Sequence, residues 1–192
     1  MRKLVFAFLI LFLLIVPVVH AEDNMDSSPS SDIVASTSSY GVTPTPAPDE
    51  YQLPYPGLLP DSPLYFVKVF RDRLIDFMVS DPLKKAELDL LQADKRLVAA
   101  DMLFSKGKQD LGESTLSKGE NYFSEGLDKL KQAKKQGMDI NGVSARFILS
   151  IDKHENIVAR LIGKSKGNTK NKLQQTAKRL ADFEKQVKEL RP

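Results

Sequence analysis

Apolar side chains recur at steps of three and four residues in five segments after residue 62, the spacing of one helix face. The first segment, residues 62–80, opens with Ser62 as N-cap and Pro63 at the first helical position, where a missing N–H is harmless. Asp81-Pro82 ends this helix, because a residue before proline disfavours the helical region. The apolar stripe consists of Leu64, Val67, Phe70, Leu74, Phe77 and Met78.

Small residues define a second pattern, in helices predicted over residues 82–105 and 109–136. Read as heptads, both helices alternate large apolar residues with small ones. The small residues are Ala86, Ala93 and Ala100 in the first helix and Gly112, Gly119 and Gly126 in the second. With a tight loop at Gly107, this register predicts an antiparallel pair closer than the usual interaxial distance of about 8 to 10 Å. The alternative is a helix that tolerates three glycines, each costing about 1 kcal/mol relative to alanine.

Two further helices complete the pattern. The fourth follows a loop at residues 137–142, ends near residue 163 and carries Phe147, Ile151, His154, Val158 and Leu161. The fifth follows a basic loop at residues 164–168 and carries Leu173, Leu180, Phe183, Val187 and Leu190. No segment has the pattern of a strand, so the sequence predicts an all-α bundle of about five helices.

The chain before residue 57 has a different composition. Residues 22–56 are rich in Ser, Thr and Pro and hold six acidic residues but no Lys or Arg. They lack the apolar groups that offset ordering entropy, which predicts a disordered acidic spacer. From Tyr51 onward, aromatic and leucine residues alternate with prolines, which predicts a non-helical strap lying on the folded domain. The folded domain itself is expected over residues 57–192.

Residues 1–21 have the features of a cleavable export signal. Arg2 and Lys3 precede an apolar run of 16 residues, Leu4 to Val19, and the segment ends with small Ala21. A retained membrane anchor is the alternative, but a spanning helix needs about 20 apolar residues. The mature chain is therefore expected to begin at Glu22 and to be periplasmic, at the cell surface or extracellular.

Candidate chemistry is sparse. The chain has no cysteine, and His154 is the one histidine beyond the signal, which excludes disulfides, thiol catalysis, and metal sites built from cysteines or histidine clusters. The carboxylates alternate with lysine on helix surfaces, and nothing resembles a nucleophile motif or a phosphate loop. We therefore expect no enzyme activity, no cofactor and no metal. A lone histidine on an apolar stripe is interpreted as a buried, hydrogen-bonded or core-edge residue.

The C-terminal end of the chain has an excess of basic residues. Residues 57–192 carry a formal charge of +7, all of it within residues 141–192. This basic end favours contact with anionic lipid or anionic wall polymer; the alternative is the solvated face of lysine-rich helices. No nucleic-acid partner is expected. The candidate contact residues are Lys164, Lys166, Lys170, Lys172, Lys178 and Arg179.

Three short motifs follow one another along the folded domain. They are Ser62-Pro-Leu-Tyr65, then Ser80-Asp-Pro-Leu-Lys-Lys-Ala-Glu-Leu88 with Ala93-Asp-Lys-Arg-Leu97, and finally Ile151-Asp-Lys-His-Glu-Asn-Ile-Val158. In order and spacing they resemble a family of exported bacterial and archaeal helical domains, catalogued as domain of unknown function 5667. The likeness covers roughly residues 53–162. It implies an exported or membrane-tethered helical domain without established activity, sometimes the outer part of anti-sigma-type membrane regulators.

Three classes of function agree with this layout. The first is an exported, non-catalytic module that binds a protein partner in the cell envelope or outside the cell. The second is a stress chaperone that exposes an apolar groove to unfolded clients, with the aromatic residues of the first helix either lining that groove or forming the bundle core. The third is a binder of anionic lipid or wall polymer through the basic end. The partner itself is not predicted by the sequence.

Overall fold

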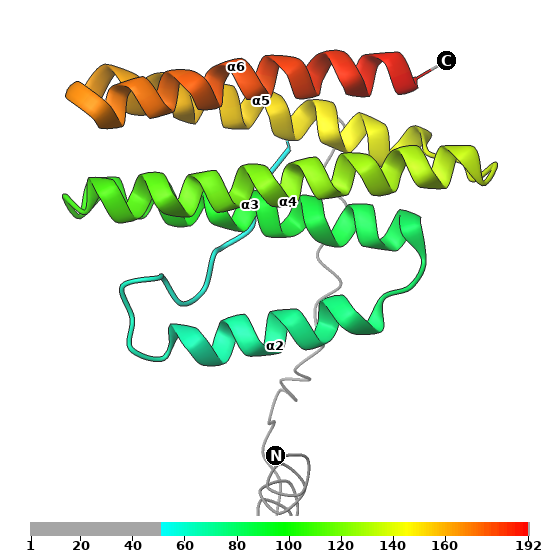
Figure 1. Cartoon of the computed structure of the whole chain (residues 1–192), viewed down its shortest axis with the longest axis horizontal. Coiled ribbons are helices and arrows are strands. Elements are labelled where there is room, and N and C mark those ends of the chain that lie inside the picture. Colours follow the sequence, from blue (N-terminus) through cyan, green and yellow to red (C-terminus); the bar gives the residue numbers. More distant parts are fainter. Residues whose placement is uncertain (1–50, 192) are drawn as a thin grey trace, which may run out of the picture. The chain divides into compact units, whose positions relative to one another are not determined.

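The computed structural model describes residues 51–191. Within that range the chain forms five helices and no strand (Figure 1): α2 (Tyr65–Met78), α3 (Pro82–Ser105), α4 (Gln109–Lys135), α5 (Asn141–Lys164) and α6 (Gly167–Leu190). The prediction of an all-α bundle is confirmed. The predicted export signal and residues 22–50 of the predicted spacer lie outside the described residues.

Helices α3 and α4 form a close antiparallel hairpin, as the small residues predict. A Cβ atom placed on Gly112, Gly119 or Gly126 would lie 3.2 to 3.3 Å from the backbone oxygens of Ala100, Ala93 and Ala86 respectively. Each glycine thus faces the alanine expected opposite it in an antiparallel register. The connecting turn contains Gly107 at a φ of +75°, a conformation that favours glycine.

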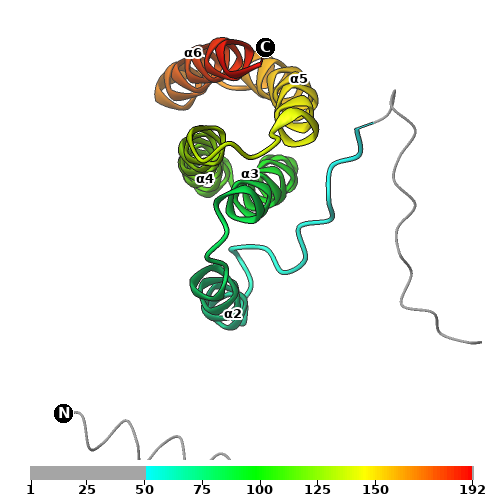
Figure 2. The same cartoon turned by 90° about the vertical axis from the view of Figure 1, so that its right-hand side faces the viewer.

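Helices α5 and α6 form a second hairpin that lies against the first (Figure 2). Helix α5 contacts α3 and α6 contacts α4, each pair running in the same direction. Four ion pairs of lysine or arginine join the two hairpins, and in each of these four the partners are 59 residues apart. These pairs are Glu87–Arg146, Asp101–Arg160, Glu113–Lys172 and Glu120–Arg179. These four pairs therefore share one offset along the chain.

The hydrophobic core lies between these two hairpins and centres on Phe123 of α4. The ring of Phe123 packs edge-on against Phe147 at 5.1 Å and stacks on Phe183 at 5.1 Å between centroids. All three rings are buried. Burial of such large apolar surfaces supplies most of the stabilisation of a bundle.

The strap, residues 51–60, lies on the bundle as predicted. Pro56 and Leu59 are buried, and Leu53 packs against the core. The Tyr51 hydroxyl donates a hydrogen bond of 2.5 Å to Asp94 of α3. Residues 51–56, which the sequence grouped with the spacer, therefore contact the folded domain.

Helix α2 is shorter than predicted: it begins at Tyr65 rather than near Ser62 and ends at Met78 rather than at residue 80. Residues 59–65 form consecutive turns instead, with bonds from Ser62 N to Leu59 O and from Tyr65 N to Ser62 O. Ser62 precedes a proline, which disfavours the helical conformation there and delays the helix. The loop predicted over residues 164–168 is also shorter, because α5 extends to Lys164 and α6 begins at Gly167.

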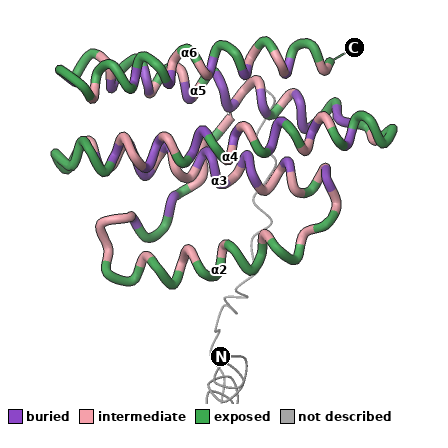
Figure 3. The backbone as a smooth tube through the Cα atoms, in the orientation of Figure 1, coloured by how far each residue is buried: buried purple, intermediate pink, exposed green. Residues whose placement is uncertain are grey.

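Helix α2 lies on the side of the α3–α4 hairpin opposite α5 and α6 (Figure 1, Figure 2). It contains no buried residue, whereas each of α3 to α6 contains several (Figure 3). The apolar stripe predicted for this helix therefore does not form part of the bundle core. It is exposed.

Candidate functional surfaces

Asp94 is the centre of a buried polar cluster between α3, α5 and the strap. Ser150 donates to Oδ1 of Asp94 at 2.6 Å, and Nε2 of His154 lies 3.0 Å from the same oxygen. Tyr51 donates to the second oxygen, Oδ2. A carboxylate only accepts hydrogen bonds, so all three partners act as donors. Asp94, Ser150 and His154 are buried.

The cluster contains the residue types of a hydrolytic triad but not its geometry. In a triad the histidine contacts the hydroxyl that it deprotonates, and the acid orients the histidine from the far side. Here Ser150 and His154 both contact one oxygen of Asp94, within a site closed to solvent. Burial, followed by the charge of Asp94, raises the pKa of Tyr51, so its hydroxyl stays a donor. The cluster therefore joins α3, α5 and the strap, and His154 is a buried, hydrogen-bonded residue as expected.

Asp89 is a second buried acid, and its carboxylate oxygens have no hydrogen-bond partner among the described residues. It lies in the α3–α4 seam, where its Cβ is 3.2 Å from the position of a Cβ on Gly126. Burial raises the pKa of Asp89 to about 7, against a smaller opposing effect of Lys85. An unpaired buried carboxylate destabilises a fold when it is ionised. Asp89 thus makes stability depend on pH.

The described residues offer neither a metal site nor a membrane-spanning helix. Among residues 51–191 there is no group of three or more His, Asp or Glu side chains arranged to hold a metal ion. Over the same part of the chain, no helix combines the length and the apolar character needed to cross a bilayer.

The outward side of α2 carries most of the exposed large apolar residues of the described chain. Phe66, Phe70 and Phe77 are 69%, 65% and 87% exposed. We call this surface the α2 outer face, consisting of Phe66, Val67, Phe70, Leu74, Phe77 and Met78. Single exposed apolar residues are normal on a protein surface, but a contiguous set marks an interaction site.

The side of α2 that faces the bundle carries the acids of this helix, together with Tyr65 and Val69. It borders a groove of about 430 Å³ whose lining includes Asp72 and Asp76 of α2. Asp76 forms an ion pair with Lys85 at the start of α3. Across the groove, the guanidinium of Arg96 lies 5.7 Å from the ring centre of Tyr65. Helix α2 therefore makes polar and cation–π contacts with the bundle, whereas its phenylalanines are turned away from it.

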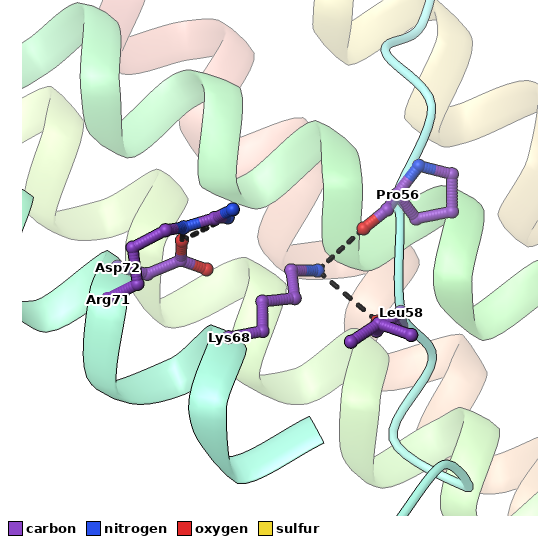
Figure 4. Close-up of polar contacts among 5 residues, drawn as sticks. All are labelled: Pro56, Leu58, Lys68, Arg71 and Asp72. Atoms are coloured by element: carbon purple, nitrogen blue, oxygen red, sulfur yellow. Dashed lines mark hydrogen bonds and ion pairs between the residues drawn. The ribbon is translucent and has the colours of Figure 1, made fainter. Parts of the chain in front are cut away.

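A second groove, of about 350 Å³, separates α2 from the strap; we call it the strap groove. Lys68 of α2 points toward the strap (Figure 4) and donates to the carbonyl oxygens of Pro56 at 2.6 Å and Leu58 at 3.4 Å. Arg71 lies one turn further along and pairs with neighbouring Asp72 at 2.7 Å. The lining consists of Tyr55, Pro56, Gly57, Leu58, Val67, Lys68, Arg71 and Lys95. It contains three cationic side chains and no acid.

The predicted basic end lies on α5, α6 and the turn between them. Lys164, Lys166, Lys170 and Lys178 are exposed. Lys172 is exposed as well, but it pairs with Glu113 at 2.8 Å. Arg179 pairs with Glu120 at 2.6 Å and lies over the ring of Phe183. Two of the six candidates are therefore engaged inside the domain, in the contacts that join the two hairpins.

Sequence reasoning missed most residues of the Asp94 cluster and the cations of the strap groove. Ser150 and His154 are one helical turn apart on the buried stripe of α5, and two polar residues on such a stripe are a signal for a shared buried partner. The identity of that partner, Asp94, depends on how α5 lies against α3. The strap groove has no comparable signal, because it forms where three separate segments meet.

The fold and its surfaces define a class: an all-α domain of two stacked hairpins with an additional helix whose apolar face is uncovered. The chain belongs to the family described as domain of unknown function (DUF5667), whose family model matches residues 57–190. The resemblance inferred from the short motifs is thus confirmed, and the match extends through α6. Neither a curated protein nor a solved structure matches the chain.

Proposed function

We propose that the protein is an exported, non-catalytic domain that acts by binding a partner through the α2 outer face. The observation that carries the proposal is the inverted orientation of α2, with its phenylalanines in solvent and its acids toward the bundle. Fully burying one such side chain is worth about 1.5 to 3 kcal/mol. A set of exposed aromatic residues is therefore a source of binding energy that folding leaves unused.

The other two functions receive less support. A chaperone for unfolded clients needs an apolar groove, whereas both grooves beside α2 contain charged side chains. At the basic end, Lys172 and Arg179 form ion pairs within the domain, so they are not available to an external partner. Four of the proposed contacts then remain, dispersed over the end of α5, the turn and α6.

Site-specific photocrosslinking in producing cells tests the proposal. A benzophenone side chain is introduced at Phe70 or Phe77 on α2, and at exposed Gln175 on α6 as the matched control. We expect covalent adducts from the two α2 positions and none from Gln175. Adducts to protein, lipid or a second copy of the chain all agree with an interaction at this face.

A variant separates specific contact from chance collision. Phe66→Ser combined with the crosslinker at Phe77 should greatly reduce the adducts, because it removes apolar surface from the same face without touching the core. Adducts from Gln175 but not from α2 would place the interaction elsewhere and disprove the proposal.

A further inference from the structure

We propose that the partner of the α2 outer face is an anionic lipid surface, on which α2 lies flat with its phenylalanines among the acyl chains and a headgroup phosphate in the strap groove. This inference rests on the proposed function, because it names the partner of the same face. It differs from lipid binding through the basic end, since it uses different residues on the opposite side of the bundle.

The distribution of residues around α2 is that of an interfacial helix. Successive residues of a helix are about 100° apart, so the six residues of the α2 outer face fall within one arc of about 120°. Arg71 and Arg73 border this arc on its two sides. Helices that lie in a membrane interface combine an apolar face with flanking cations, whose long side chains reach back to the headgroups.

The acids of α2 do not disturb this arrangement. Asp72 and Asp76 line the groove between α2 and the bundle, on the side away from the α2 outer face. Asp76 is paired with Lys85, and Asp72 is paired with Arg71. The length of α2 also agrees: at 14 residues it is shorter than the roughly 20 needed to cross a bilayer, but sufficient to lie along its surface.

The strap groove supplies the headgroup contact. Lys68, Arg71 and Lys95 line it, and no carboxylate is part of the lining, although Arg71 also pairs with Asp72 beside it. Tyr55 and Leu58 of the strap are 77% and 44% exposed beside these cations. Tyrosine has an apolar ring and a polar hydroxyl and is enriched where membranes meet water. The cationic strap groove thus complements the phosphate of a lipid headgroup, and the neighbouring α2 outer face complements the acyl chains of the same lipid.

A second copy of the chain fits this face less well. Arg71 and Arg73 border the α2 outer face on its two sides, near the middle of the helix. If two α2 helices packed face to face about a twofold axis, an arginine of one helix would therefore lie opposite an arginine of the other, whether the helices were parallel or antiparallel. Like charges brought together oppose association, whereas the same arginines attract anionic headgroups. A protein partner is an outcome of the test below.

The test uses a single tryptophan as a local reporter, since the chain contains none. Phe77→Trp places it on the α2 outer face, and Gln175→Trp places it on α6 as the control. The full chain is mixed with vesicles of phosphatidylglycerol and phosphatidylcholine in equal parts. We expect the emission of Phe77→Trp to move to shorter wavelength and to be quenched by lipids brominated in the acyl chains, and that of Gln175→Trp to stay unchanged.

Charge variants identify the headgroup contact in the same assay. Arg71→Gln with Lys95→Gln should lower the partition of Phe77→Trp onto anionic vesicles by about fivefold for each charge removed, and leave it unchanged on pure phosphatidylcholine. Phe66→Ser with Phe70→Ser should lower it at least about tenfold on both. The matched control, Lys164→Gln with Lys166→Gln and Lys170→Gln, should have little effect. Melting curves check that each variant is folded.

The outcomes separate this inference from the proposed function. The proposal of a lipid partner for α2 is wrong if the emission of Phe77→Trp does not shift on anionic vesicles. It is also wrong if binding is lost only in the variant of Lys164, Lys166 and Lys170. If crosslinks from Phe70 then lead to a protein or to a second copy, the proposed function stands and this inference fails. If α2 gives no adduct while Gln175 does, both fail.

Discussion

The α3–α4 hairpin and helix α2 are built from similar amphipathic patterns, yet their apolar sides point in opposite directions. In the hairpin, Phe123 and the small residues Ala93 and Gly119 are buried within the core. In α2, the phenylalanines are exposed and the acids face the bundle. The hairpin thus uses its apolar surface to fold, whereas α2 keeps its apolar surface available for a partner.

The contrast shows that helical periodicity alone does not determine which surface an apolar stripe contacts. A stripe lowers the free energy wherever it is removed from water, whether in a core, at a partner or in a membrane. Substitutions inside the bundle should therefore change the stability of the fold, whereas substitutions on the α2 outer face should not.

The largest expected difference lies between two phenylalanines. Phe123→Ala should lower the free energy of unfolding by about 3 to 5 kcal/mol, because it leaves a cavity against Phe147 and Phe183. Phe70→Ala on α2 should change it by no more than about 0.5 kcal/mol. Urea unfolding followed by circular dichroism measures both. Equal losses would contradict the division of the molecule into a core and an external helix.

The next effect concerns Asp89, whose pKa is raised by burial from 3.8 to about 7. Between these two pKa values the folded state holds a proton that the unfolded state releases, so the contribution of Asp89 to stability should be full below about pH 4 and be lost as the pH rises to about 7. The neighbouring charges are those of Lys85, Asp76, Glu125 and Lys129. Asp89→Asn should remove this slope and stabilise the protein by about 1 to 4 kcal/mol above pH 7. Parallel pH profiles of the two proteins would disprove the assignment.

A third prediction concerns the close approach of α3 and α4. A Cβ on Gly119 would lie 2.9 Å from the Cβ of Arg96 and 3.3 Å from the Ala93 carbonyl oxygen. Gly119→Leu should therefore lower the free energy of unfolding by about 1 to 3 kcal/mol, although leucine is the better helix former. Gly163→Leu is the control, since a Cβ at Gly163 meets nothing within 4 Å. A higher melting temperature for Gly119→Leu would show that the seam is not close-packed.

The smallest effect is expected where the strap meets the bundle. Tyr51→Phe removes the hydroxyl that donates to buried Asp94, at a cost of about 1 to 2 kcal/mol. The strap should also become more accessible to protease. Tyr55→Phe changes an exposed hydroxyl and should alter neither property. Identical digestion of Tyr51→Phe and the wild type would mean that the strap is held by Leu53 and Leu59 alone.

Features that depend on a single helix, or on two helices whose small residues repeat with the same period, could be predicted from the sequence. Both limits of α3 agree with the prediction. The start was predictable because Asp81 and Pro82 form a local cap, in which Asp81 accepts a hydrogen bond from Lys84 N at 2.9 Å. The α3–α4 register followed from small residues repeating every seventh position in both helices.

Features that depend on contacts between distant segments were not predicted. The stripe of α2 is equally compatible with burial and with exposure, and only the packing of the other four helices excludes it from the core. The partners of Asp94 come from residues 43 to 60 positions away along the chain. The start of α2 was misplaced, since the turns after Leu59 compete with the cap expected at Ser62.

The constant separation of 59 residues across the four ion pairs between the hairpins restricts how the length of this chain can vary during evolution. One residue added to the turn at residues 136–140 changes every separation to the same new value and preserves all four pairs. One residue added inside α4 between Glu113 and Glu120 rotates the rest of that helix by about 100° and withdraws Glu120 from Arg179. Insertions and deletions among related chains are therefore expected in the turns and not within the paired helices.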